Sequence, residues 1–193
     1  MKKLFHKKTV TLFILFTMFV SFSMSGSVFA SEYDSANSVK GKTMDDPAVE
    51  NILEYVSQDK NGEFKFDVRK AEKEGQSNEV IRQGKLFNQV SQAYADSKTI
   101  TLEDIVAQPS GIPIWGNWCG PGYGGGPTKD LLDAACKEHD LNYERYGYFD
   151  CRSDIILINR IERDYNRMGF YEQGMATAVK AYFNIQIRVN GCL

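Results

Sequence analysis

The most informative segment of this 193-residue chain is residues 133–143, which read DAACKEHDLNY. Its apolar residues recur at helical spacing, and His139 is the only histidine that follows the first thirty residues. Residues 118–126, upstream of it, read WCGPGYGGG and form a glycine-dense loop. Such a loop can present backbone carbonyl oxygens to a hard cation. A histidine next to an aspartate, facing this loop, therefore indicates a general base beside a cation site.

The helix around this histidine is expected to run from a cap at Thr128 to a stop at Gly147. A second helix is expected from about Asp150 to Met168, after a short turn. Two long helices with a short connection pack antiparallel. A last helical segment is expected over residues 172–183. The fold class predicted for this part of the chain is therefore mainly α-helical.

His139 and Asp154 each fall within the apolar face of their expected helix. An unpaired buried carboxylate is very costly, so Asp154 is predicted to pair with His139 and to orient it as a base. With a rise of about 1.5 Å per residue from the turn, the two residues differ in level by almost one helical turn. Asp154 is still the closest match among the acids of the second helix. A structural core histidine is the competing interpretation of His139.

The glycine loop has two rival interpretations. Gly120, Gly122 and Gly125 match the dinucleotide-binding fingerprint by spacing, but no βαβ unit surrounds them. No Gly-Lys-Ser/Thr follows the loop, so it is not a Walker loop either. We therefore interpret the glycine loop as part of a cation site.

Residues 1–30 have the features of a secretory signal peptide. Four lysines precede an apolar run over residues 10–20, and Val28-Phe29-Ala30 is typical of a cleavage site. The run is short and no stop-transfer pattern follows, which disfavours the alternative of an uncleaved anchor. Removal of the leader would change the net charge from −2 to −6, because it holds four lysines and no acid. The basic footprint of a nucleic-acid-binding protein is absent.

The four cysteines all follow residue 110, and an even number in a secreted chain predicts two disulfides. The sequence alone leaves three pairings open. A zinc site is disfavoured because no C-x-x-C spacing is present. The cysteines are Cys119, Cys136, Cys151 and Cys192.

Residues 31–110 carry no catalytic constellation. We expect a helix capped at Asp46 that runs through about Ser57, a strand over residues 63–68 and a helix over residues 78–95. The segment is a propeptide, a wall-binding arm or, in the preferred interpretation, a structural extension. Because residues 108–113 read as a linker, the predicted organisation is a signal peptide (1–30), an α-rich N-terminal extension or propeptide (31–110) and a C-terminal domain (111–193).

Taken together, residues 115–161 resemble the secreted phospholipase A2 superfamily over roughly a quarter of the chain. Residues 118–122 are similar to its calcium loop, residues 133–143 to its active-site helix, and residues 151–154 to the start of its second helix. The resemblance implies a disulfide-linked antiparallel helix pair with a calcium loop. The very short turn between the helices leaves no room for the hairpin of animal enzymes, so a compact, bacterial-like member is implied.

The resemblance also implies a role for individual residues. His139 would take a proton from water, Asp154 would orient it, and Tyr143 would support Asp154. The Gly120 N–H and a calcium ion would stabilise the oxyanion formed as the sn-2 ester is attacked. The implied calcium ligands are Asp140 and the carbonyl oxygens of Trp118, Gly120 and Gly122.

The chain departs from the family pattern at several positions. Asn142 and Ser153 replace a disulfide pair that many members have, and the loss of both halves is coherent. The loop is one residue longer than in many animal members, which bears on the carbonyl ligands. Joining Cys119 to Cys136 would fix the loop to the helix, and Cys192 is then the only cysteine left for Cys151.

The sequence thus predicts a secreted, calcium-dependent phospholipase A2 that acts at a phospholipid membrane surface and binds no nucleic acid. A catalytically silent membrane- or receptor-binding protein on the same scaffold is the main alternative, and a calcium-stabilised structural domain is a third. Because basic residues are few, no strong preference for anionic lipid is expected. The aromatic residues expected to reach the lipid boundary are Trp115, Trp118, Tyr123, Tyr146, Tyr148 and Phe149.

Overall fold

Six α-helices and one short β-hairpin make up the part of the chain that the structure, a computed structural model, describes: residues 46–98 and 111–192. The expected signal peptide and residues 108–110 of the expected linker lie outside these residues. The prediction of a mainly helical chain is confirmed. The helices are α2 (Pro47–Leu53), α3 (Val68–Lys73), α4 (Asn78–Ser97), α6 (Leu131–Tyr146), α7 (Cys151–Asp164) and α8 (Phe170–Val189), and the strands are β1 (Val56–Gln58) and β2 (Phe64–Phe66).

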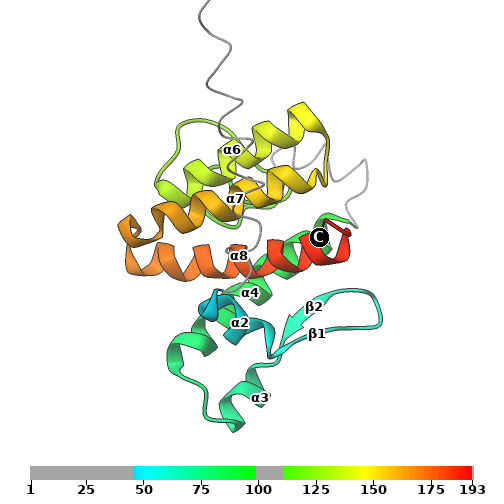
Figure 1. Cartoon of the computed structure of the whole chain (residues 1–193), viewed down its shortest axis with the longest axis vertical. Helices are drawn as coiled ribbons and strands as arrows, with labels where there is room; N and C mark the ends of the chain where they lie inside the picture. The colour runs from blue at the N-terminus through cyan, green and yellow to red at the C-terminus, as the bar shows by residue number, and fades with distance from the viewer. Residues whose placement is uncertain (1–45, 99–110, 193) are drawn as a thin grey trace, which may run out of the picture. The chain divides into compact units, whose positions relative to one another are not determined.

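Helix α8 lies between two groups of helices, with α6 and α7 on one side and α2 and α4 on the other (Figure 1). Nearly every residue from Gly174 to Ile187 is buried. A helix that is buried around its whole circumference must find apolar partners on every face. Residues 46–98 and residues 131–164 supply these partners from opposite sides. None of the described helices combines the length and the apolar character needed to cross a membrane.

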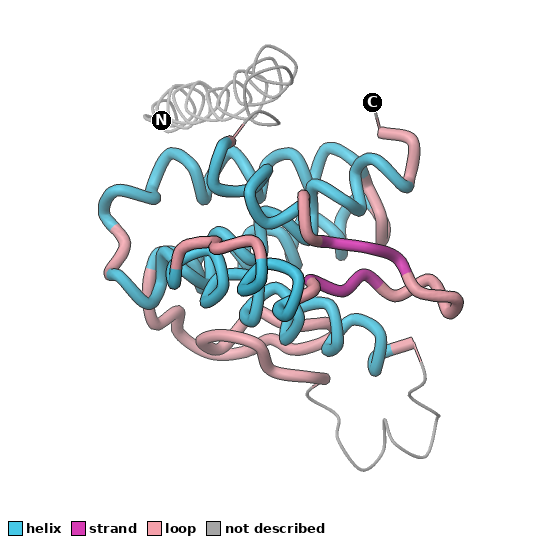
Figure 2. The backbone as a smooth tube through the Cα atoms, turned by 90° about the horizontal axis from the view of Figure 1, so that it is seen from below, coloured by secondary structure: helices cyan, strands magenta, loops and turns pink. Residues whose placement is uncertain are grey.

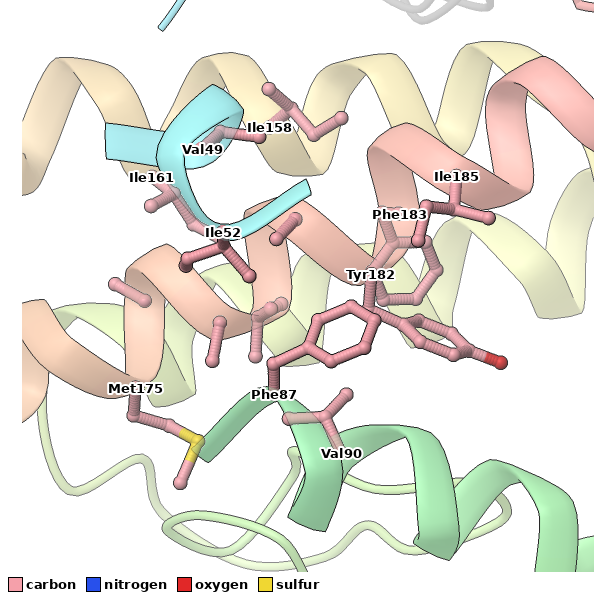
Figure 3. Packing of buried hydrophobic residues seen from close by; sticks show 14 of the residues in the cluster. Val49, Ile52, Phe87, Val90, Ile158, Ile161, Met175, Tyr182, Phe183 and Ile185 are labelled. Carbon is pink, nitrogen blue, oxygen red and sulfur yellow. The ribbon is translucent and has the colours of Figure 1, made fainter. Parts of the chain in front are cut away.

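Side chains from all six described helices contribute to one core, and Figure 3 labels members from α2, α4, α7 and α8. Val49 and Ile52 of α2 are fully buried, as are Phe87 and Val90 of α4. Helix α7 contributes Ile161 to the same cluster. Burial of a side chain of this size stabilises the fold by roughly 1.5–3 kcal/mol. The N-terminal segment therefore shares its core with the C-terminal helices.

The hairpin packs on α4 through β2 (Figure 2). The Asn88 side chain accepts a hydrogen bond from the Phe66 N–H at 2.7 Å and donates one to the Phe66 carbonyl at 3.0 Å. Gly84 lies under the Phe66 ring, where a Cβ atom would approach ring carbons to 2.4 Å. The helix expected to run through Ser57 ends at Leu53 instead, because Val56–Gln58 pairs antiparallel with β2.

The start of α6 also differs from the prediction. Asp130, rather than Thr128, caps the helix by accepting the Asp133 N–H at 2.9 Å. Its second carboxylate oxygen accepts the Trp115 indole N–H at 2.8 Å, which fixes the chain before the helix in a non-helical conformation. The predicted stop at Gly147 is observed, with a positive φ of 98° and its N–H bonded to the Tyr143 carbonyl.

The later helices also begin and end at other residues than expected. Helix α7 ends at Asp164, and the rest of the expected segment forms a 3₁₀ turn over Tyr165–Arg167. Helix α8 begins two residues before the expected Glu172 and continues past Phe183 to Val189.

Two disulfides are present, Cys119–Cys136 and Cys151–Cys192. This is the one of the three possible pairings that the resemblance implied. The first bond joins the glycine loop to α6, and the second joins the start of α7 to the tail after α8. Neither bond joins α6 directly to α7. In the chain-entropy model, a loop of this kind contributes on the order of 3–4 kcal/mol.

A buried ion pair fastens α2 to α8. Lys180 is 2 % exposed, and its ammonium group lies 2.5 Å from Asp46 Oδ2. Burial raises the pKa of the Asp46 carboxyl, but its hydrogen bond to Lys180 and the Lys180 charge outweigh this effect, so the pKa is lowered overall. A carboxyl whose pKa is lowered by folding stabilises the fold above its unfolded pKa, and that stabilisation is lost as the pH falls through the folded pKa.

We expect Asp46→Asn to lower the free energy of unfolding by about 3 kcal/mol at neutral pH, because the Lys180 charge stays buried without its partner. The substitution retains an oxygen for the α2 cap. The double variant Asp46→Asn/Lys180→Met should recover most of the loss. Glu50→Gln, which removes an exposed partner of Arg188, is the control and should change stability by less than about 1 kcal/mol. Chemical denaturation over a series of decreasing pH values from pH 7 tests this, and an Asp46→Asn deficit that does not shrink as the pH falls would contradict it.

Candidate active site

The glycine loop is held at its base by one buried carboxylate. Asp133 is fully buried, and its Oδ1 accepts the N–H groups of Asn117 at 2.9 Å and Trp118 at 2.7 Å. Its Oδ2 accepts the Lys129 N–H at 2.8 Å. The two ends of the loop are thereby tied to the first turn of α6. Gly116 is required here, since a Cβ atom would lie 2.2 Å from the Asp133 carboxyl carbon.

Within the loop, Gly120 adopts a φ of 147° and its backbone passes close to Ile112. A Cβ atom at Gly120 would lie 1.9 Å from the Ile112 carbonyl oxygen, so no other residue fits without a backbone shift. The Gly120 N–H donates no hydrogen bond to any described residue. It is therefore available to a ligand, as its predicted oxyanion role requires.

His139, Asp154 and Tyr143 form a hydrogen-bonded group between α6 and α7. His139 Nε2 lies 2.9 Å from Asp154 Oδ1, and the Tyr143 hydroxyl donates to the same oxygen at 2.6 Å. Asp154 is fully buried and His139 is 4 % exposed. His139 and Asp154 were expected to differ in level by almost one helical turn, yet their side chains meet. The expectation compared backbone positions only and neglected the reach of the two side chains.

The hydrogen bond to Asp154 assigns the imidazole tautomer. An ionised carboxylate only accepts, so Nε2 carries the proton when His139 is neutral. Nδ1 is then an acceptor with a free lone pair. Asp140 Oδ1 lies 3.8 Å from Nδ1, which is too far for a hydrogen bond but close enough for a strong electrostatic interaction. The geometry is that of an oriented base.

Burial lowers the pKa of His139, but the Asp140 and Asp154 carboxylates outweigh this effect and raise it above its ordinary value. The charged imidazolium is therefore favoured in the folded chain. A histidine with a raised pKa stabilises the fold below its unfolded pKa, and this contribution is lost as the pH rises through the folded pKa.

Asp140 faces the glycine loop. A Cβ atom at Gly124 would lie 3.4 Å from Asp140 Oδ2. Burial raises the pKa of Asp140, and the nearby His139 partly offsets this effect. His139 is its only cationic neighbour among the described residues. A partly buried carboxylate with so little compensation is chemically suited to a cation.

One pocket brings most of the predicted site residues together. Trp118, Gly120, His139 and Asp140 line it, together with Cys119 and Cys136 of the first disulfide. Gly122 is not among its lining residues and instead lies against Gly111. The pocket thus gathers the predicted base, Asp140 and the predicted oxyanion donor. Asp154 and Tyr143 belong to the hydrogen-bonded group of the base without lining the pocket, and Gly122 lies apart from it.

Sequence reasoning missed the apolar side of this pocket. Val90 and Tyr94 come from α4, and Val179 and Phe183 come from α8. The Phe183 ring meets the His139 ring edge-on, with centroids 4.8 Å apart. The helical periodicity over residues 78–95 marked these positions of α4 as apolar, but no sequence signal connected them to a site some fifty residues away.

No family model, no curated protein and no solved structure matches this chain. Within residues 46–98 and 111–192, no group of three or more histidine, cysteine, aspartate or glutamate side chains could hold a metal ion. A site built from one carboxylate and several backbone carbonyls does not contain such a group.

His139 is the only histidine after residue 30, which permits a direct test of the electrostatics around it. We expect imidazole NMR titration of His139 to give a pKa above 6.5 in calcium-free protein, because two carboxylates outweigh its burial. Asp154→Asn and Asp140→Asn should each lower the value. The control Glu144→Gln changes an exposed acid of α6 and should leave it unchanged. A wild-type pKa at or below 6.5 would show that burial dominates.

Proposed function

We propose that this chain is a secreted, calcium-dependent phospholipase A2 that hydrolyses the sn-2 ester of glycerophospholipids. The observation that carries the proposal is the hydrogen-bonded group of His139, Asp154 and Tyr143, whose imidazole lines a pocket together with Asp140 and part of the glycine loop. The resemblance of residues 115–161 supplies the reaction class. Two disulfides are compatible with an oxidising, extracellular location.

In the proposed reaction, His139 Nδ1 accepts a proton from a water molecule as that water attacks the ester carbonyl. The imidazolium is stabilised by Asp154 through the Nε2–H hydrogen bond, and Tyr143 holds the carboxylate in place. The proton on Nδ1 then passes to the leaving alcohol. The Gly120 N–H donates to the oxyanion that develops on the carbonyl oxygen.

The residues around Asp140 fit a calcium ion chemically. Asp140 offers a partly buried carboxylate, and the carbonyl oxygens of Trp118 and Gly122 accept no hydrogen bond from any described residue. The Gly120 carbonyl accepts the Tyr123 N–H at 3.1 Å and retains a second lone pair. Bound calcium would supply positive charge to the oxyanion. Asp140, Trp118, Gly120 and Gly122 remain the proposed ligands.

The test is release of an sn-2 fatty acid from mixed phospholipid vesicles by the chain that starts at residue 31. We expect release to require millimolar calcium and to fall at least 100-fold in His139→Ala, because general bases contribute roughly 10²–10⁴-fold. Asp140→Asn should abolish the calcium response, and the matched control Glu144→Gln should retain it.

The outcomes separate the candidate functions. Calcium-dependent release that survives His139→Ala would overturn the proposed base. If the folded protein binds calcium and calcium raises its melting temperature, but no fatty acid is released, the result would favour a calcium-stabilised structural domain. Folded protein that binds no calcium up to millimolar concentration would favour the catalytically silent binding module.

The turn between α6 and α7 is the proposed contact with the membrane. Tyr148 is 72 % exposed and Phe149 is 64 % exposed. Phe149 also has a positive φ of 64°, a conformation that costs roughly 1–2 kcal/mol for a residue other than glycine. The Tyr148 ring lies 5.3 Å from that of Tyr143, so the turn adjoins the catalytic group. Exposed aromatic rings beside a site suit a lipid headgroup boundary.

We expect Tyr148→Ser/Phe149→Ser to weaken vesicle binding about tenfold or more, because two aromatic rings no longer enter the interface. Hydrolysis of a monomeric short-chain substrate should change far less. Phe170→Ser/Tyr171→Ser is the matched control, since this aromatic pair is equally exposed at the start of α8. Vesicle co-sedimentation measures the effect, and equal losses in the two double variants would contradict it.

A further inference from the structure

Helix α4 connects the N-terminal segment to the candidate site. Val90 and Tyr94, near the middle and the end of α4, line the same pocket as His139 and Asp140. No residue of this segment belongs to the part of the chain that resembles a known family. A segment without catalytic residues thus provides part of the wall around the proposed base.

The Tyr94 ring is held in place by two aromatic residues of α8. It stacks on Tyr182 with centroids 4.5 Å apart and an angle of 21°, and it meets Phe183 edge-on at 5.8 Å. Phe183 in turn contacts the His139 ring at 4.8 Å. Aromatic pairs of this kind contribute about 0.5–1.5 kcal/mol beyond their buried area. The position of Tyr94 relative to the base is therefore fixed by packing.

The Tyr94 hydroxyl forms no hydrogen bond with any described residue. Burial, the neighbouring Tyr182 hydroxyl and the Asp140 and Asp154 carboxylates raise the pKa of this hydroxyl well above its ordinary value, so it stays protonated and can donate. The Tyr94 side chain is only half-buried, so a ligand at the pocket can reach this hydroxyl. A ligand in the pocket that presents an acceptor oxygen would provide the missing partner.

The segment is also firmly attached to the rest of the fold. Its first described residue, Asp46, pairs with the buried Lys180, and Val49 and Ile52 are fully buried beside α8. Removal of residues 46–98 would expose this face of α8 and leave the Lys180 charge without its partner. These contacts are those of a permanent part of a core.

We propose that Tyr94 is a specificity-determining residue that contacts the ligand, and that residues 46–98 form a permanent wall of the working pocket rather than a removable pro-segment. The ligand class is an amphipathic lipid, whose apolar chain lies against Val90 and Phe183 and whose polar end offers an oxygen to the Tyr94 hydroxyl. The identification of the ligand as a lipid rests on the proposed function.

The experiment compares three variants of the chain that starts at residue 31. Tyr94→Phe keeps the stacked ring and removes the hydroxyl, whereas Tyr94→Ala removes both. Tyr182→Phe is the matched control, because Tyr182 is the other half of the stack but does not line the pocket. Isothermal titration calorimetry with a monomeric lysophospholipid measures binding, and thermal melting establishes that each variant is folded.

We expect Tyr94→Phe to weaken lysophospholipid binding roughly threefold to tenfold, as for the loss of one hydrogen bond, and Tyr94→Ala to weaken it further. Tyr182→Phe should bind as the wild type does. With a phospholipid substrate, Tyr94→Phe should raise KM and leave kcat within about twofold. A merely structural role would instead lower the melting temperature without this separation of KM from kcat.

Two results would overturn the proposal. Equal lysophospholipid affinity for wild type and Tyr94→Phe would remove the hydroxyl contact. Tighter binding or faster hydrolysis by Tyr94→Ala would show that α4 blocks the pocket, as a pro-segment does. Lysophospholipid binding needs no turnover, so failure of the catalytic proposal alone leaves this test intact.

Discussion

Burial of α8 on all sides is the constraint on which the rest of this structure depends. Its apolar faces need partners from both halves of the chain, and its polar residues need them as well. Lys180 pairs with Asp46 of the N-terminal segment, and Thr177 lies 3.0 Å from the Tyr165 hydroxyl that follows α7. The same helix places Phe183 against His139. The packing that joins the two halves therefore also shapes the candidate site.

Two buried aspartates have different hydrogen-bond partners, and this difference distinguishes a structural role from a chemical one. Asp133 receives three backbone N–H groups, which cannot change protonation, and it serves to fix the loop. Asp154 receives an imidazole and a phenol on one oxygen, while its other oxygen has no partner among the described residues. A carboxylate satisfied by ionisable side chains can respond to a proton on its partner. Of the two, only Asp154 is placed to support a base.

The local elements were predictable because short-range signals determine them. The apolar spacing of α4, α6 and α7 and the glycine stop at Gly147 were sufficient to place these helices. Thr128 was the wrong cap because the indole of Trp115 and the backbone around Asp133 decide where the chain turns, and these contacts span many residues. The strand at Val56–Gln58 was missed for a similar reason, since its partner strand and α4 stabilise it rather than its own propensity.

The composition of the candidate site could be predicted only on its polar side. His139 and Asp154 stand out because polar or charged groups within an apolar helix face require an explanation, and that requirement is visible in one sequence. Asp140 stands out because it follows His139 and is expected to face the glycine loop. Tyr94, Val90 and Phe183 do not stand out, because apolar and aromatic residues at helical spacing are what any core helix contains. Their relation to the site follows from the packing of α4 on α8, which no local signal encodes.

The charges gathered around His139 connect these polar residues to one another. In the calcium-free chain, two carboxylates act on one imidazole and raise its pKa, which favours the protonated form that cannot act as a base. Burial also raises the pKa of Asp140, because desolvation makes its ionised form less favourable. A cation held by Asp140 would stabilise the ionised carboxylate and would weaken the electrostatic attraction that keeps the proton on His139. If Asp140 holds the proposed cation, the ionisation of His139 and the binding of that cation are coupled, because Asp140 lies only 3.8 Å from the imidazole.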